Sequence, residues 1–336
     1  MARVFIIAEA GVNHNGSVDL ALKLVDAAKA SGADAVKFQT FRAERLATET
    51  AHKAAYQERT VSESESQLEM LKRLELSAEA HRRIIEHCRE AGIEFLSSPF
   101  DSESADLLES LDVRIVKIPS GEITNLLFLK HIAMKGRPVI LSTGMSTLGE
   151  VEEAVAAIRC NGSPSLTLLH CVTEYPAPYA EVNLRAMMTL KQAFGLPVGY
   201  SDHTPGIEIA IAAVAMGAEV IEKHFTLDRG LPGPDHAASL EPGELAEMVQ
   251  AIRHVEAALG NGIKTPAPCE VPNIGVARKS IVADRNLPAG HRISEDDLRV
   301  KRPGTGLAPR LMDQVVGRML RNAVQKDELI RWDQLA

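Results

Sequence analysis

The sequence has 336 residues, of which 45% are hydrophobic and 24% charged, proportions that are ordinary for a globular protein. The formal net charge of −8 argues against general nucleic-acid binding, and no apolar run reaches membrane-spanning length. The first residues lack a secretory pattern and the four cysteines form no C-x-x-C pair, so we expect a cytoplasmic protein without a thiolate metal site.

Strand-like apolar runs alternate with amphipathic stretches over residues 1–260. The amphipathic stretches, such as 18–31 and 150–160, carry apolar residues three and four apart, which indicates helices. The strand-like runs lie at 4–9, 34–39, 93–98, 114–119, 138–143, 165–170, 196–201 and 218–225. Their number and spacing predict a (β/α)8 TIM barrel, a fold of the α/β class. An open, doubly wound sheet is the competing interpretation, and the missing G-x-G-x-x-G turn after the first strand disfavours it.

Three segments depart from this alternation. Residues 44–77 are long and polar with a helical portion at 66–76, and we expect them to form a lid over the barrel. Residues 261–273 carry three prolines and predict a linker. Residues 274–336 contain short strand-like pieces and turn signals, which predict a small β-rich domain.

The charge is distributed unevenly between these parts. From Asn273 onward there are twelve Lys or Arg and eight Asp or Glu, so this tail has a net charge of +4 and the preceding residues −12. A basic tail beside an acidic body suggests that the two dock, within one chain or between chains. A simple contribution to solubility is an equally good interpretation.

Lysines and serines gather at the expected carboxyl ends of several strands, where barrel enzymes place their active sites. Lys37 and Lys117 lie on the second and fourth strands, and the hydroxyls of Ser98, Ser120 and Ser142 are expected between them. A lone lysine there is more often an ion-pair partner than a ligand contact. Two together favour a pocket for a phosphorylated or carboxylated anion.

Two histidines lie at the carboxyl ends of the last two strands of the predicted barrel. His203 follows the seventh strand and His224 ends the eighth. If these strands are neighbours, the two imidazoles converge at the barrel mouth and suit a borderline divalent metal such as manganese or zinc. Together with the lysines they predict a site for a small anion and a carbonyl or hydroxyl substrate polarised by a metal.

Nine strings, in order along nearly the whole chain, resemble the sialic acid synthase family. They are IAEAGVNHNG, DAVKFQTF, FLSSPFD, VKIPSGEITN, ILSTGMST, LLHCVTEYPAP, GYSDHT, EKHFT and GPDHAASLEP. The basic tail, with VKRPGTG, resembles the antifreeze-like (SAF, β-clip) domain that these enzymes carry. The resemblance implies a metal-dependent transferase that condenses phosphoenolpyruvate, an N-acetylated mannose-type sugar and water into a nonulosonic acid and phosphate.

The resemblance also implies residue roles. It assigns phosphoenolpyruvate binding to Lys37, Ser98, Lys117, Ser120, Ser142, Thr173 and Ser201. It assigns sugar binding to Glu9, Gln39, Phe100, Tyr175, Asp235 and Arg302. It assigns the metal, manganese first and magnesium or cobalt as alternatives, to His203 and His224, and catalysis to Glu9, Lys37, Lys117 and His224. Thr173 departs from the Asn of some relatives, which a hydroxyl replaces only in part.

Arg302 resembles the arginine that the tail domain of one subunit inserts into the active site of its partner. This implies a domain-swapped homodimer. The acceptor sugar is either N-acetylmannosamine or 2,4-diacetamido-2,4,6-trideoxymannose. No residue of the sequence distinguishes a neuraminate synthase from a legionaminate synthase.

Four other functions compete with this interpretation. A pseudaminate synthase is the first, but members of that branch tend to differ at the GPDH string. A class I aldolase would use Lys117 or Lys37 as a Schiff-base nucleophile. The heptulosonate-phosphate synthases share the donor, but the SAF-like tail argues against them. A binding protein that uses the barrel as scaffold is the least expected, because many polar side chains converge in one place.

Overall fold

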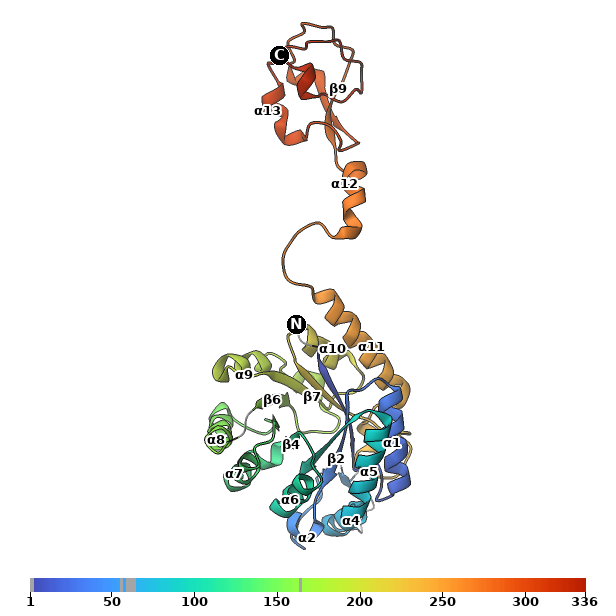
Figure 1. The fold of residues 1–336 in the computed structure, drawn as a ribbon, viewed down its shortest axis with the longest axis vertical. Coiled ribbons are helices and arrows are strands. Elements are labelled where there is room, and N and C mark those ends of the chain that lie inside the picture. Colours follow the sequence, from blue (N-terminus) through green and yellow to red (C-terminus); the bar gives the residue numbers. More distant parts are fainter. Residues whose placement is uncertain (1–2, 55–56, 59–64, 163–164) are drawn as a thin grey trace. The chain divides into compact units, whose positions relative to one another are not determined.

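The computed structural model describes residues 3–54, 57–58, 65–162 and 165–336. The chain divides into two compact units, Met1–Gly260 and Asn261–Ala336 (Figure 1). Each unit has its own apolar core.

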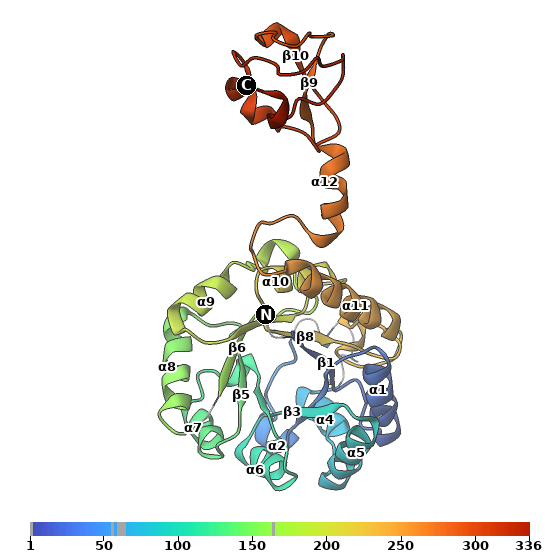
Figure 2. The same cartoon turned by 45° about the horizontal axis from the view of Figure 1, so that its top comes forward.

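Parallel strands close into a barrel in the first unit, in the order β1 to β8, and β8 pairs with β1. Figure 2 shows the ring of strands with helices outside it. The strands are β1 Phe5–Gly11, β2 Ala35–Thr40, β3 Glu94–Pro99, β4 Val116–Ile118, β5 Val139–Ser142, β6 Leu166–Cys171, β7 Val198–Asp202 and β8 Val220–His224. All eight predicted strands are present, and closure of the sheet confirms the barrel over the doubly wound alternative.

Helices follow the strands and cover the outside of the ring. They are α1 Val18–Ala30, α5 Ala78–Ala91, α6 Ser102–Ser110, α7 Leu126–Met134, α8 Leu148–Arg159, α9 Ala186–Phe194, α10 Glu208–Ala215 and α11 Pro242–Leu259. Several begin at a side chain that accepts a hydrogen bond from the first turn, as Ser17 does for α1 and Thr147 for α8. Both helices that the periodicity predicted, at 18–31 and 150–160, are thus confirmed. Among the described residues, no helix has both the length and the apolar character that crossing a bilayer requires.

The inside of the barrel is apolar at one end and polar at the other. The apolar end is a small core of Ile7, Ala35, Leu96, Ile140, Leu169 and Val220. Two residues further along the same strands lie Glu9, Lys37, Ser98, Ser142, Cys171 and Glu222. Because strand side chains alternate faces, each of these polar or thiol side chains lies on the same face as the apolar one before it. One period-two pattern therefore seals the barrel floor and supplies the residues at its mouth.

The connection between β2 and α5 contains α2 (Ala43–Leu46) and α4 (Gln67–Leu74). The helical portion predicted at 66–76 is confirmed as α4, which starts with a capping box between Ser66 and Glu69. Parts of the predicted lid, residues 55–56 and 59–64, lie outside the described residues. The described parts pack into an apolar cluster with Val12 and Phe41.

The second unit is small and contains an antiparallel pair, β9 Ser280–Ala283 and β10 Leu298–Lys301. Two short helices, α12 Val271–Ala277 and α13 Met312–Val315, belong to it as well. The stretch expected as a linker, 261–273, thus includes the start of α12. Asp297 is fully buried and accepts hydrogen bonds from Arg285, His291 and Ser294, which hold the pKa of its carboxyl well below its usual range despite burial.

Candidate active site

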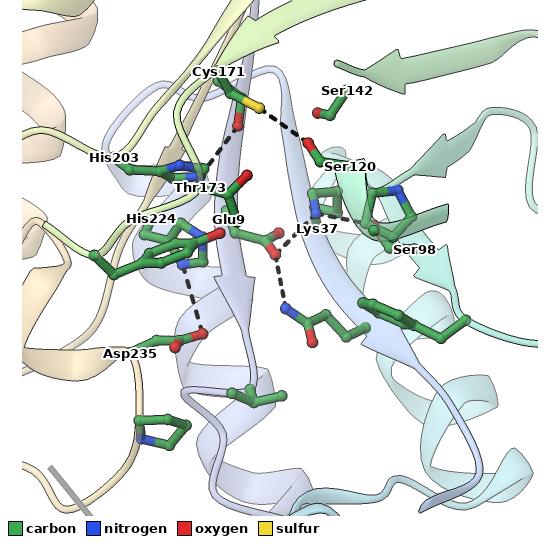
Figure 3. Close-up of a pocket in the computed structure, with 18 of the residues that line it drawn as sticks. Glu9, Lys37, Ser98, Ser120, Ser142, Cys171, Thr173, His203, His224 and Asp235 are labelled. Carbon is green, nitrogen blue, oxygen red and sulfur yellow. Dashed lines mark hydrogen bonds and ion pairs between the residues drawn. The ribbon is translucent and has the colours of Figure 1, made fainter. Parts of the chain in front are cut away.

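A cavity of about 330 Å3 opens at the carboxyl ends of the barrel strands (Figure 3). Its lining includes all the barrel residues that the sequence proposed for the site. These are Glu9, Lys37, Gln39, Ser98, Phe100, Lys117, Ser120, Ser142, Thr173, Tyr175, Ser201, His203, His224 and Asp235. Arg302 belongs to the second unit, where its Nε donates to the carbonyl of Ala277 at 3.1 Å. The cavity has the size of a small-molecule site.

Both lysines reach into this cavity and are held by hydroxyls and carboxylates. Lys37 Nζ donates to Ser98 Oγ at 3.1 Å and lies 2.9 Å from Glu9 Oε1. Lys117 Nζ donates to Ser142 Oγ at 2.7 Å. Glu222 lies between the two ammonium groups, 3.7 Å from that of Lys37 and 3.4 Å from that of Lys117. The lysines are therefore ion-pair partners, and both converge on Glu222, while an anion pocket between them stays a prediction.

Glu222 also lines the cavity, although the sequence alone assigned it no role. Its carboxylate is buried and accepts from Ser201 Oγ at 3.0 Å. The alternation in VIEKH places it on the face of His224, and that signal could have identified it. Its pairing with two lysines from β2 and β4 could not have been read from the string, because it depends on closure of the barrel.

The charges of this group follow from burial and mutual attraction. Burial raises the pKa of Glu9 to about 7. Burial also acts to raise the pKa of Glu222, but Lys117 and Lys37 outweigh it and lower that pKa to about 2. Burial would lower the pKa of Lys37, but Glu222 and Glu9 raise it, whereas burial lowers the pKa of Lys117. With Glu9 protonated, one carboxylate faces two ammonium groups, and the pocket favours an added anion.

Hydroxyls and a backbone amide form a cradle beside Lys117. Ser120 Oγ accepts from the amide of Gly144 at 2.9 Å and lies 3.1 Å from Cys171 Sγ. Thr173 Oγ1 is buried and has no hydrogen-bond partner among the described residues. A Cβ at position 144 would lie 2.4 Å from Thr173 Oγ1, so only glycine lets the loop after β5 close this tightly. Such a cluster of small donors suits phosphate oxygens.

The two imidazoles converge as the sequence predicted. The ring centroids of His203 and His224 are 5.5 Å apart, and the Tyr175 ring lies 4.3 Å and 5.3 Å from them. His203 Nδ1 donates to the carbonyl of Val172 at 2.6 Å, which leaves its Nε2 as the lone-pair nitrogen. Burial lowers the pKa of His203 to about 4 and that of His224 well below its usual value. Both rings are therefore neutral near pH 7, the form that binds metal ions.

These residues fit a divalent metal with open coordination positions. His224 Nδ1 is buried without a hydrogen bond from any described residue and lies 3.9 Å from Asp235 Oδ2. Burial raises the pKa of Asp235 to about 6. In the described part of the chain, no group of three or more His, Cys, Asp or Glu side chains is placed to hold a metal. Two histidines alone would leave coordination positions for substrate oxygens.

A model of the NeuB family matches residues 24–264, and a SAF domain model matches residues 278–336. The chain belongs to the NeuB family. The resemblance to sialic acid synthases with a C-terminal SAF domain is thereby confirmed.

This NeuB-family chain is similar to curated relatives over nearly its whole length and to a solved structure over most of it. It is 52% identical to the N,N'-diacetyllegionaminic acid synthase of Campylobacter jejuni, covering 98% of this chain and 100% of that one. It is 51% identical to the protein of the same name from Legionella pneumophila, covering 98% and 94%. The crystal structure of an N-acetylneuraminic acid synthetase from Leptospira borgpetersenii is 39% identical, with a TM-score of 0.72 over 81% of this chain and 90% of that one.

A second buried ion pair lies behind the histidines, on the outer face of β7 and β8 of the NeuB barrel. Lys223 Nζ is 2.8 Å from Asp202 Oδ2 and donates to the carbonyl of Thr204 at 2.5 Å. Asp202 Oδ1 accepts from the Thr204 amide and hydroxyl at 2.9 and 2.8 Å. Asp202 and Thr204 flank His203 in sequence, so this pair ties the backbone that carries one imidazole to the strand that carries the other.

Proposed function

We propose that this protein condenses phosphoenolpyruvate with 2,4-diacetamido-2,4,6-trideoxymannose and water, giving N,N'-diacetyllegionaminic acid and phosphate. The observation that carries the proposal is that two lysines and two neutral histidines face one cavity. The names of the two relatives more than 50% identical to the chain support the choice of acceptor. N-acetylmannosamine is the second candidate acceptor.

The lysines and hydroxyls would bind the anionic donor. Lys117, Ser142 and the cradle around Ser120 present donors suited to the phosphate, and Lys37 with Ser98 presents donors suited to the carboxylate. Carbon three of phosphoenolpyruvate forms the new bond to the aldehyde carbon, and water adds at carbon two. The bond from carbon two to the phosphate oxygen then breaks and leaves a ketone; of the two protons of water, one ends on the former aldehyde oxygen and the other leaves with the phosphate. The ammonium groups stabilise most strongly the charge that gathers on the departing phosphate.

His203 and His224 would hold the divalent cation, with manganese the first choice and magnesium or cobalt as alternatives. A cation held there supplies a Lewis acid for the aldehyde oxygen of the acceptor. The protein's own contribution is to fix the His203 ring through its hydrogen bond to the Val172 carbonyl, whereas His224 Nδ1 lies 3.9 Å from Asp235 Oδ2 and stays without a hydrogen bond from the described residues. Both rings stay neutral because they are buried.

Glu9 is our candidate proton shuttle or hydroxyl clamp. Its Oε1 lies 2.9 Å from Lys37 Nζ and 3.5 Å from Gln39 Nε2, while its Oε2 accepts no hydrogen bond from the described residues. A carboxyl with a pKa of about 7 can give or take a proton near neutral pH. Gln39, Tyr175 and Asp235 line the same cavity and would orient the sugar.

We further propose a homodimer in which Arg302 of the SAF unit reaches the active site of the partner subunit. The guanidinium would bind sugar oxygens there. The basic charge of this unit and the acidic charge of the barrel unit support such docking. An Arg302→Ala variant should lose sugar affinity while keeping phosphoenolpyruvate affinity, and equal loss of both would contradict this role.

Phosphate release tests the function directly. The protein is mixed with phosphoenolpyruvate, manganese and one of three acceptors: N-acetylmannosamine, 2,4-diacetamido-2,4,6-trideoxymannose or its altrose counterpart. We expect release with the second and loss of release with a chelator, restored by manganese. Preference for the altrose sugar would favour a pseudaminate synthase, and a borohydride-trapped adduct on Lys117 or Lys37 would favour an aldolase. No release with any acceptor would overturn the proposal.

A further inference from the structure

One part of the cavity wall is apolar and comes from the connection between β2 and α5. Leu46 of α2 and Met70, Leu71 and Leu74 of α4 all line the cavity. They belong to one apolar cluster, in which Met70 is 1% exposed and Leu74 2% exposed. Val12 and Phe100 complete this wall. We call these six residues the apolar wall.

Polar sugar-facing groups gather at another place in the same cavity. A Cβ added at Gly11 would lie 3.3 Å from Glu9 Oε1, 3.5 Å from Gln39 Nε2 and 3.6 Å from Asp235 Oδ2, so these three side chains meet around one point. None of the three belongs to the apolar cluster. The cavity therefore offers a sugar two chemically different surfaces.

The reaction fixes which end of the acceptor meets each surface. The aldehyde carbon must lie beside phosphoenolpyruvate, between the lysines and the histidines. The remote carbons then extend away from the strand ends toward the loops at the mouth, and the segment with α2 and α4 is one of these loops. Carbons four to six would then extend toward the apolar wall, which lines the same cavity.

We propose that the apolar wall selects an acceptor with methyl groups at its remote end. This inference rests on the proposed function and deepens it. A methyl at carbon six and the acetamido methyl at carbon four would contribute favourable binding free energy, because they would leave water and pack against leucine and methionine side chains. A hydroxyl at either position loses its hydrogen bonds to water and meets no polar partner in the wall.

Gln67, the first residue of α4, adds one amide to the cavity lining next to the wall. A side-chain amide carries both a donor and an acceptor, and so does an acetamido group. An acetamido group would pair with this amide and pack its methyl on the wall, whereas a hydroxyl could use only the amide, so the discrimination comes from the methyl. Pockets of this kind discriminate between methyl and hydroxyl on the order of 100-fold.

The test compares kcat/KM for 2,4-diacetamido-2,4,6-trideoxymannose and for N-acetylmannosamine in the full-length protein with manganese. We expect the wild type to prefer the first by on the order of 100-fold. Leu71→Gln places an amide in the wall and should reduce this ratio by about tenfold without changing the KM for phosphoenolpyruvate. Leu46→Gln is a second variant at a half-buried position, for use if the first does not fold.

Leu68→Gln is the matched control. Leu68 belongs to the same helix and packs on the same apolar cluster, but it is not among the residues that line the cavity. It should therefore keep the wild-type ratio. An unchanged ratio in both wall variants, or an equal change in Leu68→Gln, would overturn the inference. If the wild type releases no phosphate with either sugar, the proposed function fails and the inference fails with it.

Discussion

The inner and outer faces of β7 and β8 carry two buried groups of charges that differ in one respect. On the outer face, Lys223 and both carboxylate oxygens of Asp202 are fully engaged with each other and with Thr204. On the inner face, Glu222 meets two lysines, yet its Oε2 accepts no hydrogen bond from the described residues. The carboxylate oxygens of the outer ion pair are both engaged, whereas the inner group has unused bonding capacity, and on the outer face only the hydroxyl of Tyr200 among the described residues of these two strands lacks a partner.

Unused capacity in a buried group is costly, because each unpaired polar atom has lost its water. The inner face keeps several such atoms close together: Glu9 Oε2, Thr173 Oγ1, Glu222 Oε2 and His224 Nδ1. The outer pair, which is equally buried, needs nothing further. We infer that the inner atoms are matched to a ligand and that the outer pair serves stability and positioning. Four substitutions test this difference.

Lys117→Met should give the largest loss of activity. It removes a donor suited to the phosphate while Lys37 remains beside Glu222, so kcat/KM should fall about 10²–10³-fold with little change in the free energy of unfolding. Phosphate release and denaturant unfolding measure the two quantities. Lys191→Met, which removes a surface ion pair to Glu219, is the control and should change neither. Retained activity would remove Lys117 from the site.

Lys223→Met should lower stability and leave most of the activity. It leaves the Asp202 carboxylate buried without its cation, so the free energy of unfolding should fall by about 3–5 kcal/mol. The folded fraction should keep turnover within about tenfold of the wild type. The double variant Lys223→Met with Asp202→Leu should regain part of the stability, since no unpaired charge remains. Wild-type stability in the single variant would contradict the structural role of the pair.

Glu9→Gln should change the pH dependence of donor binding. As pH rises through about 7, Glu9 becomes anionic, adds a second carboxylate beside Lys37, and weakens phosphoenolpyruvate binding by about tenfold. The glutamine variant should lack this loss and should bind the donor well at all pH values while turning over poorly. Isothermal titration calorimetry gives the affinities for phosphoenolpyruvate. Protonation of phosphoenolpyruvate itself affects both proteins equally, so the difference between them reports Glu9. Unchanged turnover would remove Glu9 from the mechanism.

Thr173→Val should have the smallest effect. The hydroxyl has no partner among the described residues, so its removal should leave the free energy of unfolding nearly unchanged. The KM for phosphoenolpyruvate should rise about fivefold, because one donor in the cradle is lost. Steady-state kinetics and thermal unfolding measure the two. A loss of stability with an unchanged KM would mean that the hydroxyl serves the fold.

Much of the barrel site could be predicted from strand ends alone. Lys37 and Lys117 lie within the second and fourth strands, and the period of two places both on the inner face. His224 ends the eighth strand and His203 directly follows the seventh. Roles that depend on contacts between different strands or helices were harder to predict from the sequence. The role of Glu222 depends on two lysines far away in sequence, and the apolar wall depends on how α4 packs over the barrel mouth.

The sequence by itself determined the number of strands, the side chains that face inward and the family. Local alternation of apolar and polar residues fixes the strands and their inward-facing side chains, and the nine ordered strings identify the family. Only the tertiary structure decided which charges are neighbours. Closure of the sheet brings β2, β4 and β8 around one axis, and Lys37 and Lys117 then share one carboxylate, Glu222, although Lys223 next to it in sequence faces the other way.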